Sequence, residues 1–258
     1  MTLGYSGTLF ILAFDHRTPL QRDLFGSVGE PSQEQALTIS RAKGLILEGL
    51  KRSLDKGVAK RSAAILIDEQ FGADVARRAK EEGIGLALAV ERSGQKEFDF
   101  EYGADFPSHI ERFDPDFCKA LLRYNPEGDR ALNRRQAQRL RDLSDWLAGR
   151  KSRLMVELLL PPEPDQLERV GGDTIRFDRE LRPKLMIDAI VELQEAGVEA
   201  DVWKIEGIDS RQNCEALARA AAALRSGPGR QDPINIQTTK AALNKDQSSL
   251  TALNVHVW

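Results

Sequence analysis

Lys204 lies in the middle of a short apolar segment, Asp201-Val-Trp-Lys-Ile-Glu-Gly207, which has the composition of a buried strand. Strand side chains alternate between two faces, so Lys204 and Glu206 are predicted to point one way and Trp203 and Ile205 the other. A lysine is rarely buried without a partner or a chemical role. One such role is covalent, because a neutral amine attacks a carbonyl and forms a Schiff base. The structural alternative is a salt bridge with Glu206 or another acid.

Two further ionisable residues lie within predicted strands. Lys119 opens the fourth strand, and Glu157 occupies the middle of the fifth. Side-by-side strands would bring both residues to Lys204. A second cation and partial burial favour the neutral form of a lysine amine, and Glu157 could move protons between the carbinolamine, imine and enamine steps. A buried charged network that ties three strands together is the alternative.

Polar residues also follow the other predicted strands. Asp15 and Arg17 follow the first strand, Asp68 and Glu69 the second, and Glu91 the third. These acids could orient the hydroxyls of a polyol substrate, hold a divalent metal, cap the next segments or pair with Arg17. Arg92 and Arg123 could contact a phosphate through their guanidinium groups, or form ordinary surface ion pairs. The candidate substrate-binding residues are Arg17, Asp68, Glu69, Glu91, Arg123 and Glu206.

Short apolar runs alternate with longer amphipathic ones along the chain. Strands are predicted at residues 9–14, 63–67, 85–90, 119–123, 154–160 and 202–205. Helices are predicted at residues 33–56, 73–82, 133–147, 181–196 and 211–224, the first of them capped by Ser32. Nearly continuous apolar strands separated by helices indicate a parallel sheet covered on both faces.

The positions of the polar residues favour a (β/α)8 TIM-barrel type fold over a doubly wound sheet. In such a barrel the loops that follow the strands carry the chemistry. A doubly wound sheet usually has a GxGxxG or GxxxxGK[ST] loop after its first strand, and neither pattern occurs here. The predicted fold class is therefore α/β, of the (β/α)8 TIM-barrel type.

The composition argues against nucleic-acid binding, membrane insertion and secretion. The 258 residues carry a formal net charge of −3, which gives no electrostatic footprint for nucleic acid. The sequence has no apolar run long enough to span a membrane, and its start lacks the basic region and apolar core of a signal peptide. Its two cysteines are far apart, which fits a reducing cytoplasm. The three histidines form no HxH or HExxH pattern, so no metal and no cofactor are predicted.

Six motifs occur in an order that resembles a known family. They are Phe14-Asp-His-Arg17, Ile67-Asp-Glu-Gln-Phe-Gly72, Val90-Glu-Arg-Ser-Gly-Gln95, Arg123-Tyr-Asn-Pro-Glu-Gly-Asp129, Val156-Glu-Leu-Leu-Leu160 and Asp201-Val-Trp-Lys-Ile-Glu-Gly207. The chain resembles the 5-dehydro-2-deoxyphosphogluconate aldolase domain of bacterial inositol catabolism, which is often fused to a sugar kinase. It is more distantly similar to class I tagatose-bisphosphate aldolases. The resemblance covers roughly residues 8 to 224.

The resemblance implies a metal-independent aldolase that cleaves 2-deoxy-5-keto-gluconate 6-phosphate to dihydroxyacetone phosphate and malonate semialdehyde. It places the Schiff-base lysine at Lys204, the acid/base glutamate at Glu157 and the assisting lysine at Lys119. Asp15 falls at the family's first-strand aspartate. The implied partner is a phosphorylated keto sugar acid. A homo-oligomer and an association with a sugar kinase are also compatible with the resemblance.

The chain departs from the family after the sixth predicted strand and its helix. Family members continue with two strands that close the barrel and supply its phosphate site, but here the sequence becomes Gly227-Pro-Gly-Arg-Gln-Asp-Pro233. We therefore expect an aldolase-like domain of about six βα units at residues 1–225 and a divergent irregular tail at residues 226–258. Strands one and six are then expected to keep open edges. The competing function is that of an inactive, truncated remnant or an interaction module.

Overall fold

The computed structural model describes residues 4–27, 29–223 and 235–238. They belong to two compact units. The N-terminal unit comprises residues 8–119, and the C-terminal unit comprises residues 1–7 and 120–258.

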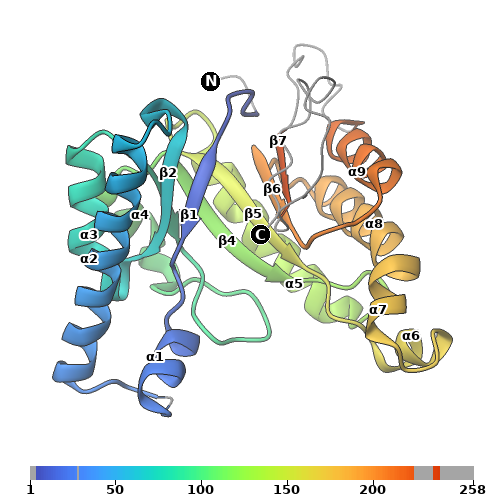
Figure 1. Cartoon of the computed structure of the whole chain (residues 1–258). Coiled ribbons are helices and arrows are strands. Elements are labelled where there is room, and N and C mark those ends of the chain that lie inside the picture. Colours follow the sequence, from blue (N-terminus) through green and yellow to red (C-terminus); the bar gives the residue numbers. More distant parts are fainter. Residues whose placement is uncertain (1–3, 28, 224–234, 239–258) are drawn as a thin grey trace. The chain divides into compact units, whose positions relative to one another are not determined.

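The N-terminal unit is a parallel sheet with helices packed against it (Figure 1). Its strands pair in chain order, and the fourth strand continues into the C-terminal unit. The strands are β1 (Phe10–Ala13), β2 (Ala63–Asp68), β3 (Gly85–Ala89) and β4 (Phe117–Arg123). The helices are α1 (Thr18–Phe25), α2 (Gln33–Asp55), α3 (Glu69–Glu81) and α4 (Phe106–Phe113), with short 3-10 turns at Lys60–Ser62 and Gly103–Asp105.

Local sequence explains where these elements begin. Every residue of β2 is buried, as expected for a strand covered on both faces. Helix α2 begins at a capping box, in which Ser32 Oγ accepts from Gln35 N at 3.2 Å and Gln35 Oε1 accepts from Ser32 N at 2.9 Å. The Asp68 carboxylate caps α3 by accepting from Phe71 N at 2.8 Å. The end of β2 is thereby fixed relative to α3, the helix that follows it.

The C-terminal unit repeats the same alternation of strand and helix (Figure 1). Its strands are β5 (Arg153–Leu159), β6 (Val202–Ile205) and β7 (Asn235–Thr238), all parallel, and Tyr124 N just after β4 donates to Leu159 O of β5 at 2.9 Å. The helices are α5 (Arg130–Leu147), α6 (Pro164–Arg169), α7 (Thr174–Arg176), α8 (Arg182–Glu195) and α9 (Arg211–Ala223), and a π-helical turn covers Phe177–Leu181. Helices α8 and α9 pack side by side.

The fold class is α/β, of the incomplete (β/α) TIM-barrel type, as predicted. Each strand from β1 to β6 is followed by helix, and within each unit the strands pair in parallel with their neighbours in the chain. The described residues form seven parallel strands, fewer than the eight of a closed barrel.

The expectation of an open edge on the sixth strand is wrong. Strand β7 pairs in parallel with β6 at four positions, from Val202↔Asn235 to Ile205↔Thr238. The predicted tail therefore contributes a strand at residues 235–238, while its remaining residues, 226–234 and 239–258, lie outside the described part of the chain. Strand β7 has a single large aliphatic residue, Ile236, so its pairing with β6 is not visible in the local pattern.

Candidate active site

A lysine and a carboxylate form an ion pair on adjacent strands of the C-terminal unit. Glu157 on β5 and Lys204 on β6 are paired in the strand register. Lys204 Nζ donates to Glu157 Oε1, and the two side chains are only 12% and 13% exposed. The acid that pairs with Lys204 is therefore Glu157, and both groups are largely withdrawn from water.

Glu206 follows β6 and is engaged elsewhere in the same unit. Its carboxylate accepts from Leu160 N at 2.7 Å and forms an ion pair with Arg182 at the start of α8. Burial raises the pKa of the Glu206 carboxyl, an effect that the Leu160 N–H and the Arg182 guanidinium oppose. Glu206 thus ties the ends of β5 and β6 to α8. Arg182, which sequence reasoning missed, completes this link.

The N-terminal unit holds a second buried cluster around Lys119. Lys119 Nζ lies 2.7 Å from Asp15 Oδ2 and 3.0 Å from Glu91 Oε1, and its side chain is 1% exposed. Burial raises the pKa of the Glu91 carboxyl, while the charges of Lys119 and Arg17 lower it and that of Asp15 raises it. The structure thus brings together four of the predicted site residues in one charged network.

Arg17 is fixed by carboxylates of its own unit. Its guanidinium donates to Glu91 O at 2.7 Å, to Glu91 Oε1 at 3.1 Å and to Glu101 Oε2 at 2.9 Å. Glu101 also accepts from Ser93 N at 3.2 Å. Arg17 therefore links the end of β1 to the loop after β3.

Asp68 forms an ion pair that is completely buried. Its partner is Lys43 of α2, and both side chains are 0% exposed. Lys43 Nζ also donates to Phe14 O at 2.7 Å and to His16 O at 3.1 Å, the carbonyls on either side of Asp15. Lys43 thus holds the backbone around Asp15, and Asp68 serves the fold at this point.

Lys43 was not singled out from the sequence, although a signal existed. It lies between Ile39 and Leu47 at four-residue spacing, and both of these are fully buried. A charged residue in the apolar stripe of a helix implies a buried partner.

Glu69, the neighbour of Asp68, pairs with α4. Its carboxylate oxygens lie 2.8 Å from His109 Nδ1 and 2.9 Å from Arg112 Nη1. The Tyr102 ring stacks on the His109 ring, with centroids 3.5 Å apart and planes 6° from parallel. Burial, together with the charges of Glu69 and Glu101, raises the pKa of Tyr102 to about 12. Glu69 therefore anchors α4 to the start of α3.

The predicted phosphate contacts are exposed arginines. Arg123 ends β4 with an exposed side chain, and its carbonyl accepts from Gln136 Nε2 at 2.9 Å. Arg92 lies 3.8 Å from Asp99. In the chain as far as the structure describes it, no group of three or more histidine, cysteine or carboxylate side chains has the arrangement of a metal site. Neither Cys118 nor Cys214 forms a disulfide with a residue that the structure describes.

The Lys204–Glu157 pair has the composition of a Schiff-base site. An amine needs a proton acceptor before it attacks a carbonyl, and Glu157 Oε1 is hydrogen-bonded to that amine. Lys204 and Glu157 lie in the C-terminal unit, whereas Lys119 lies with Asp15 in the N-terminal unit. The predicted assistance of Lys204 by Lys119 stays a prediction.

Among the described residues, none of the helices is long and apolar enough to cross a membrane.

No match was found among curated proteins. Among solved structures, the chain is similar to a thermostable mutant of a xylanase from Cellvibrio japonicus, with 11% sequence identity and a TM-score of 0.43 over 90% of this chain and 69% of that chain. A model of the family described as "Uncharacterized protein conserved in bacteria (DUF2090)" matches residues 4–225, and because this is most of the sequence, the chain belongs to that family.

Proposed function

We propose that this chain is a class I aldolase that cleaves a phosphorylated keto sugar acid through a Schiff base on Lys204. The observation that carries the proposal is the partly buried ion pair between Lys204 and Glu157 on adjacent strands. The sequence resemblance suggests 2-deoxy-5-keto-gluconate 6-phosphate as the substrate.

The proposed reaction needs one amine and one proton carrier. Glu157 takes a proton from Lys204, and the amine attacks the C5 carbonyl carbon to form a carbinolamine. Loss of water gives the iminium ion. A base removes the proton of the 3-hydroxyl group, the C3–C4 bond breaks, and its electron pair moves to the iminium nitrogen. This step releases malonate semialdehyde and leaves an enamine.

The second half of the reaction returns the enzyme to its starting state. The enamine takes a proton at C4, and water adds to the resulting iminium carbon. Collapse of that carbinolamine releases dihydroxyacetone phosphate and the free lysine. Water is lost once and gained once, so the net reaction is cleavage of one carbon–carbon bond. Glu157 is the natural proton carrier in these steps because it is hydrogen-bonded to the reacting nitrogen.

The N-terminal unit supports a role in binding hydroxyl groups. Asp15 and Glu91 present carboxylate oxygens, and Lys119 holds both of them in place. A role of these groups in orienting the substrate's polyol chain stays a prediction from the sequence. The family's phosphate-binding loops correspond to the region after residue 225, of which the structure describes residues 235–238.

Borohydride trapping tests the proposal directly. The full chain is incubated with dihydroxyacetone phosphate and sodium borohydride, and intact-mass and peptide spectra locate any reduced adduct. We expect one adduct on Lys204 in the wild type and none in Lys204→Ala. Lys184→Ala is the matched control, because Lys184 lies on α8 of the same unit with a side chain that is 78% exposed.

Turnover of the keto acid phosphate distinguishes an active enzyme from an inactive remnant. We expect release of malonate semialdehyde by the wild type and by Lys184→Ala. Absence of both adduct and turnover in the wild type would reject the aldolase and favour the remnant. An adduct that persists undiminished in Lys204→Ala would reject Lys204 as the nucleophile.

A further inference from the structure

We propose that this chain self-associates through the groove between α2 and α3, with α2 of a second copy lying antiparallel in the groove. The inference concerns the outer surface of the N-terminal unit and does not depend on the proposed function.

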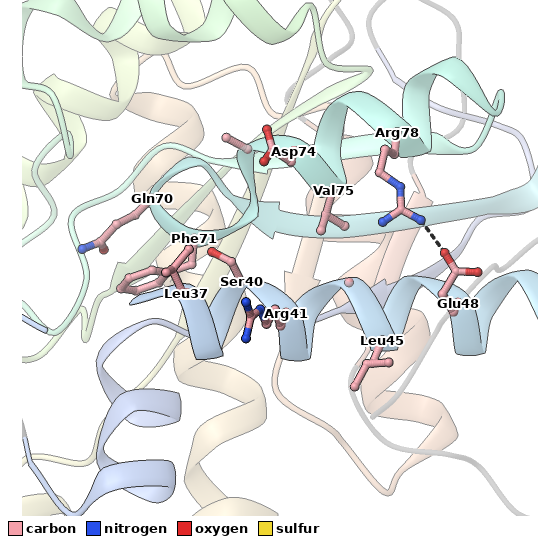
Figure 2. A pocket seen from close by; sticks show the side chains of 12 residues that line it. Leu37, Ser40, Arg41, Leu45, Glu48, Gln70, Phe71, Asp74, Val75 and Arg78 are labelled. Atoms are coloured by element: carbon pink, nitrogen blue, oxygen red, sulfur yellow. Dashed lines mark hydrogen bonds and ion pairs between the residues drawn. The ribbon is translucent and has the colours of Figure 1, made fainter. Parts of the chain in front are cut away.

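The groove runs along both helices and has a volume of about 770 Å³. Figure 2 shows Leu37 and Phe71 at one end and the Glu48–Arg78 ion pair at the other. The lining residues on which the argument depends are Leu37, Arg41, Gly44, Leu45 and Glu48 of α2 and Arg78 of α3.

The α2 wall of the groove exposes more apolar surface than a solvated helix needs. Leu37 is 51% exposed and Leu45 is 73% exposed, the latter being the most exposed large hydrophobic residue in the described part of the chain. They are eight residues apart, which is just over two helical turns, so they share one side of α2. The opposite side, at Ile39 and Leu47, is already buried in the core. Apolar residues on both sides of a helix indicate that both sides are covered.

The order of residues along α2 indicates which partner covers it. A two-fold symmetric contact requires that residue i faces residue j while j faces i. If α2 is reversed about a point between Gly44 and Leu45, Arg41 of each copy faces Glu48 of the other. The same operation places Leu45 against Gly44, which has no side chain to block it. The surface is therefore complementary to itself in both charge and shape.

Arg41 is available for such a contact. It is exposed and makes no ion pair with any residue that the structure describes. Glu48 already binds Arg78 and lies 3.5 Å from Lys51, so an approaching Arg41 would join an existing charged group. With α2 and α3 of one copy facing α2 and α3 of the other, the contact would form a four-helix arrangement in two layers, a common packing.

Sedimentation equilibrium of the full chain tests the proposal. We expect a monomer–dimer equilibrium in the wild type. Leu45→Lys should weaken it by about 100-fold or more, because two leucine side chains per dimer lose their buried environment. Ile175→Lys is the matched control, since Ile175 is 61% exposed on α7, outside the groove, and should leave the dimer unchanged. A monomer at every concentration overturns the proposal. So does a wild-type dimer that Leu45→Lys does not weaken more than Ile175→Lys does.

A charge-exchange experiment tests the antiparallel register. Arg41→Glu and Glu48→Arg should each weaken self-association, because each places like charges opposite one another. An equimolar mixture of the two variants should form a heterodimer tighter than either homodimer, since both facing pairs are then of opposite charge. Circular dichroism checks that both variants are folded. If folded variants show no preference for the heterodimer, the proposed register is wrong.

Discussion

Glu157 and Lys204 occupy paired positions on β5 and β6, and their side chains form an ion pair. In parallel strands, residues in register place their side chains on the same face of the sheet. A slip of one residue would move one of the two groups to the opposite face. The contact between the proposed nucleophile and its proton carrier is therefore set by the register of two strands almost fifty residues apart in the chain.

We expect Glu157→Gln to separate imine formation from turnover. The amide cannot accept a proton as a carboxylate does, so turnover of the keto acid phosphate should fall by about 10²- to 10⁴-fold. Lys204 is still present, so borohydride should still trap dihydroxyacetone phosphate on it, but more slowly, because Glu157 also takes the proton that frees the amine. Glu195→Gln on the exposed end of α8 serves as control and should change neither quantity. Unchanged turnover in Glu157→Gln would exclude Glu157 as the proton carrier.

We expect Lys43→Met to destabilise the chain by about 3–5 kcal/mol, because it leaves the buried Asp68 carboxylate without its cation. Urea denaturation measures the change. The matched control is Lys51→Met on the same helix, whose ion pair with Glu82 spans 3.0 Å and is about one-third exposed on each side. Such a solvent-exposed pair is screened by water and contributes much less to stability than a buried one. Equal losses of unfolding free energy in the two variants would show that the buried Lys43–Asp68 pair stabilises the fold no more than the exposed Lys51–Glu82 pair does.

Strand positions and helix caps could be predicted from the sequence, whereas the partners of the buried charged side chains could not. The apolar runs predicted β6 at residues 202–205, as observed, and Ser32 was correctly expected to cap α2. These features depend on neighbours in the chain. By contrast, Asp68 and Glu69 are adjacent in sequence but bind Lys43 and His109, which come from two different helices. Such partners are set by packing over long sequence distances.

Strand β7 was not predicted from the sequence, because its formation depends on a neighbouring strand. Its four residues carry little apolar pattern, and they form a strand through pairing with β6. Propensity in a short strand is weak beside the context that the neighbouring strand supplies. Lys204 pairs with Glu157 and not with Glu206 because of the register between β5 and β6. The spacing of residues within one strand does not reveal that register.

We expect Tyr102 to make the fold sensitive to alkaline pH. Its pKa is raised to about 12, against about 10 for an unfolded tyrosine, chiefly by burial. Between these values the unfolded chain loses the phenol proton while the folded chain keeps it. The stabilisation is therefore complete below pH 10 and is lost as the pH rises through 12. Tyr102→Phe should show a flatter decline in unfolding free energy over this range.

Ultraviolet absorbance of tyrosinate gives an independent measure. Loss of the Tyr102 signal in Tyr102→Phe should remove a titration step near pH 12. A Tyr102 that ionises at the ordinary tyrosine pKa would contradict the predicted effect of burial.

We expect Gly72→Ala to destabilise the N-terminal unit by about 1–3 kcal/mol, the usual cost of overpacking a core. Gly72 is buried in α3, and a Cβ built there overlaps Cγ1 and Cδ1 of Ile67, which is itself fully buried in β2. The matched control is Gly49→Ala in α2, where a Cβ meets nothing within 4 Å. Alanine in a helix interior is more stable than glycine by roughly 0.5–1 kcal/mol, so this variant should gain stability. Urea denaturation at low protein concentration compares the unfolding free energies of the two variants.

A double-mutant cycle with Ile67→Ala identifies the cause of the loss in Gly72→Ala. Removing the overlapped Ile67 atoms should make the combined loss of stability smaller than the sum of the single losses. Additive losses would show that the close approach of α3 to β2 at Gly72 does not limit the packing.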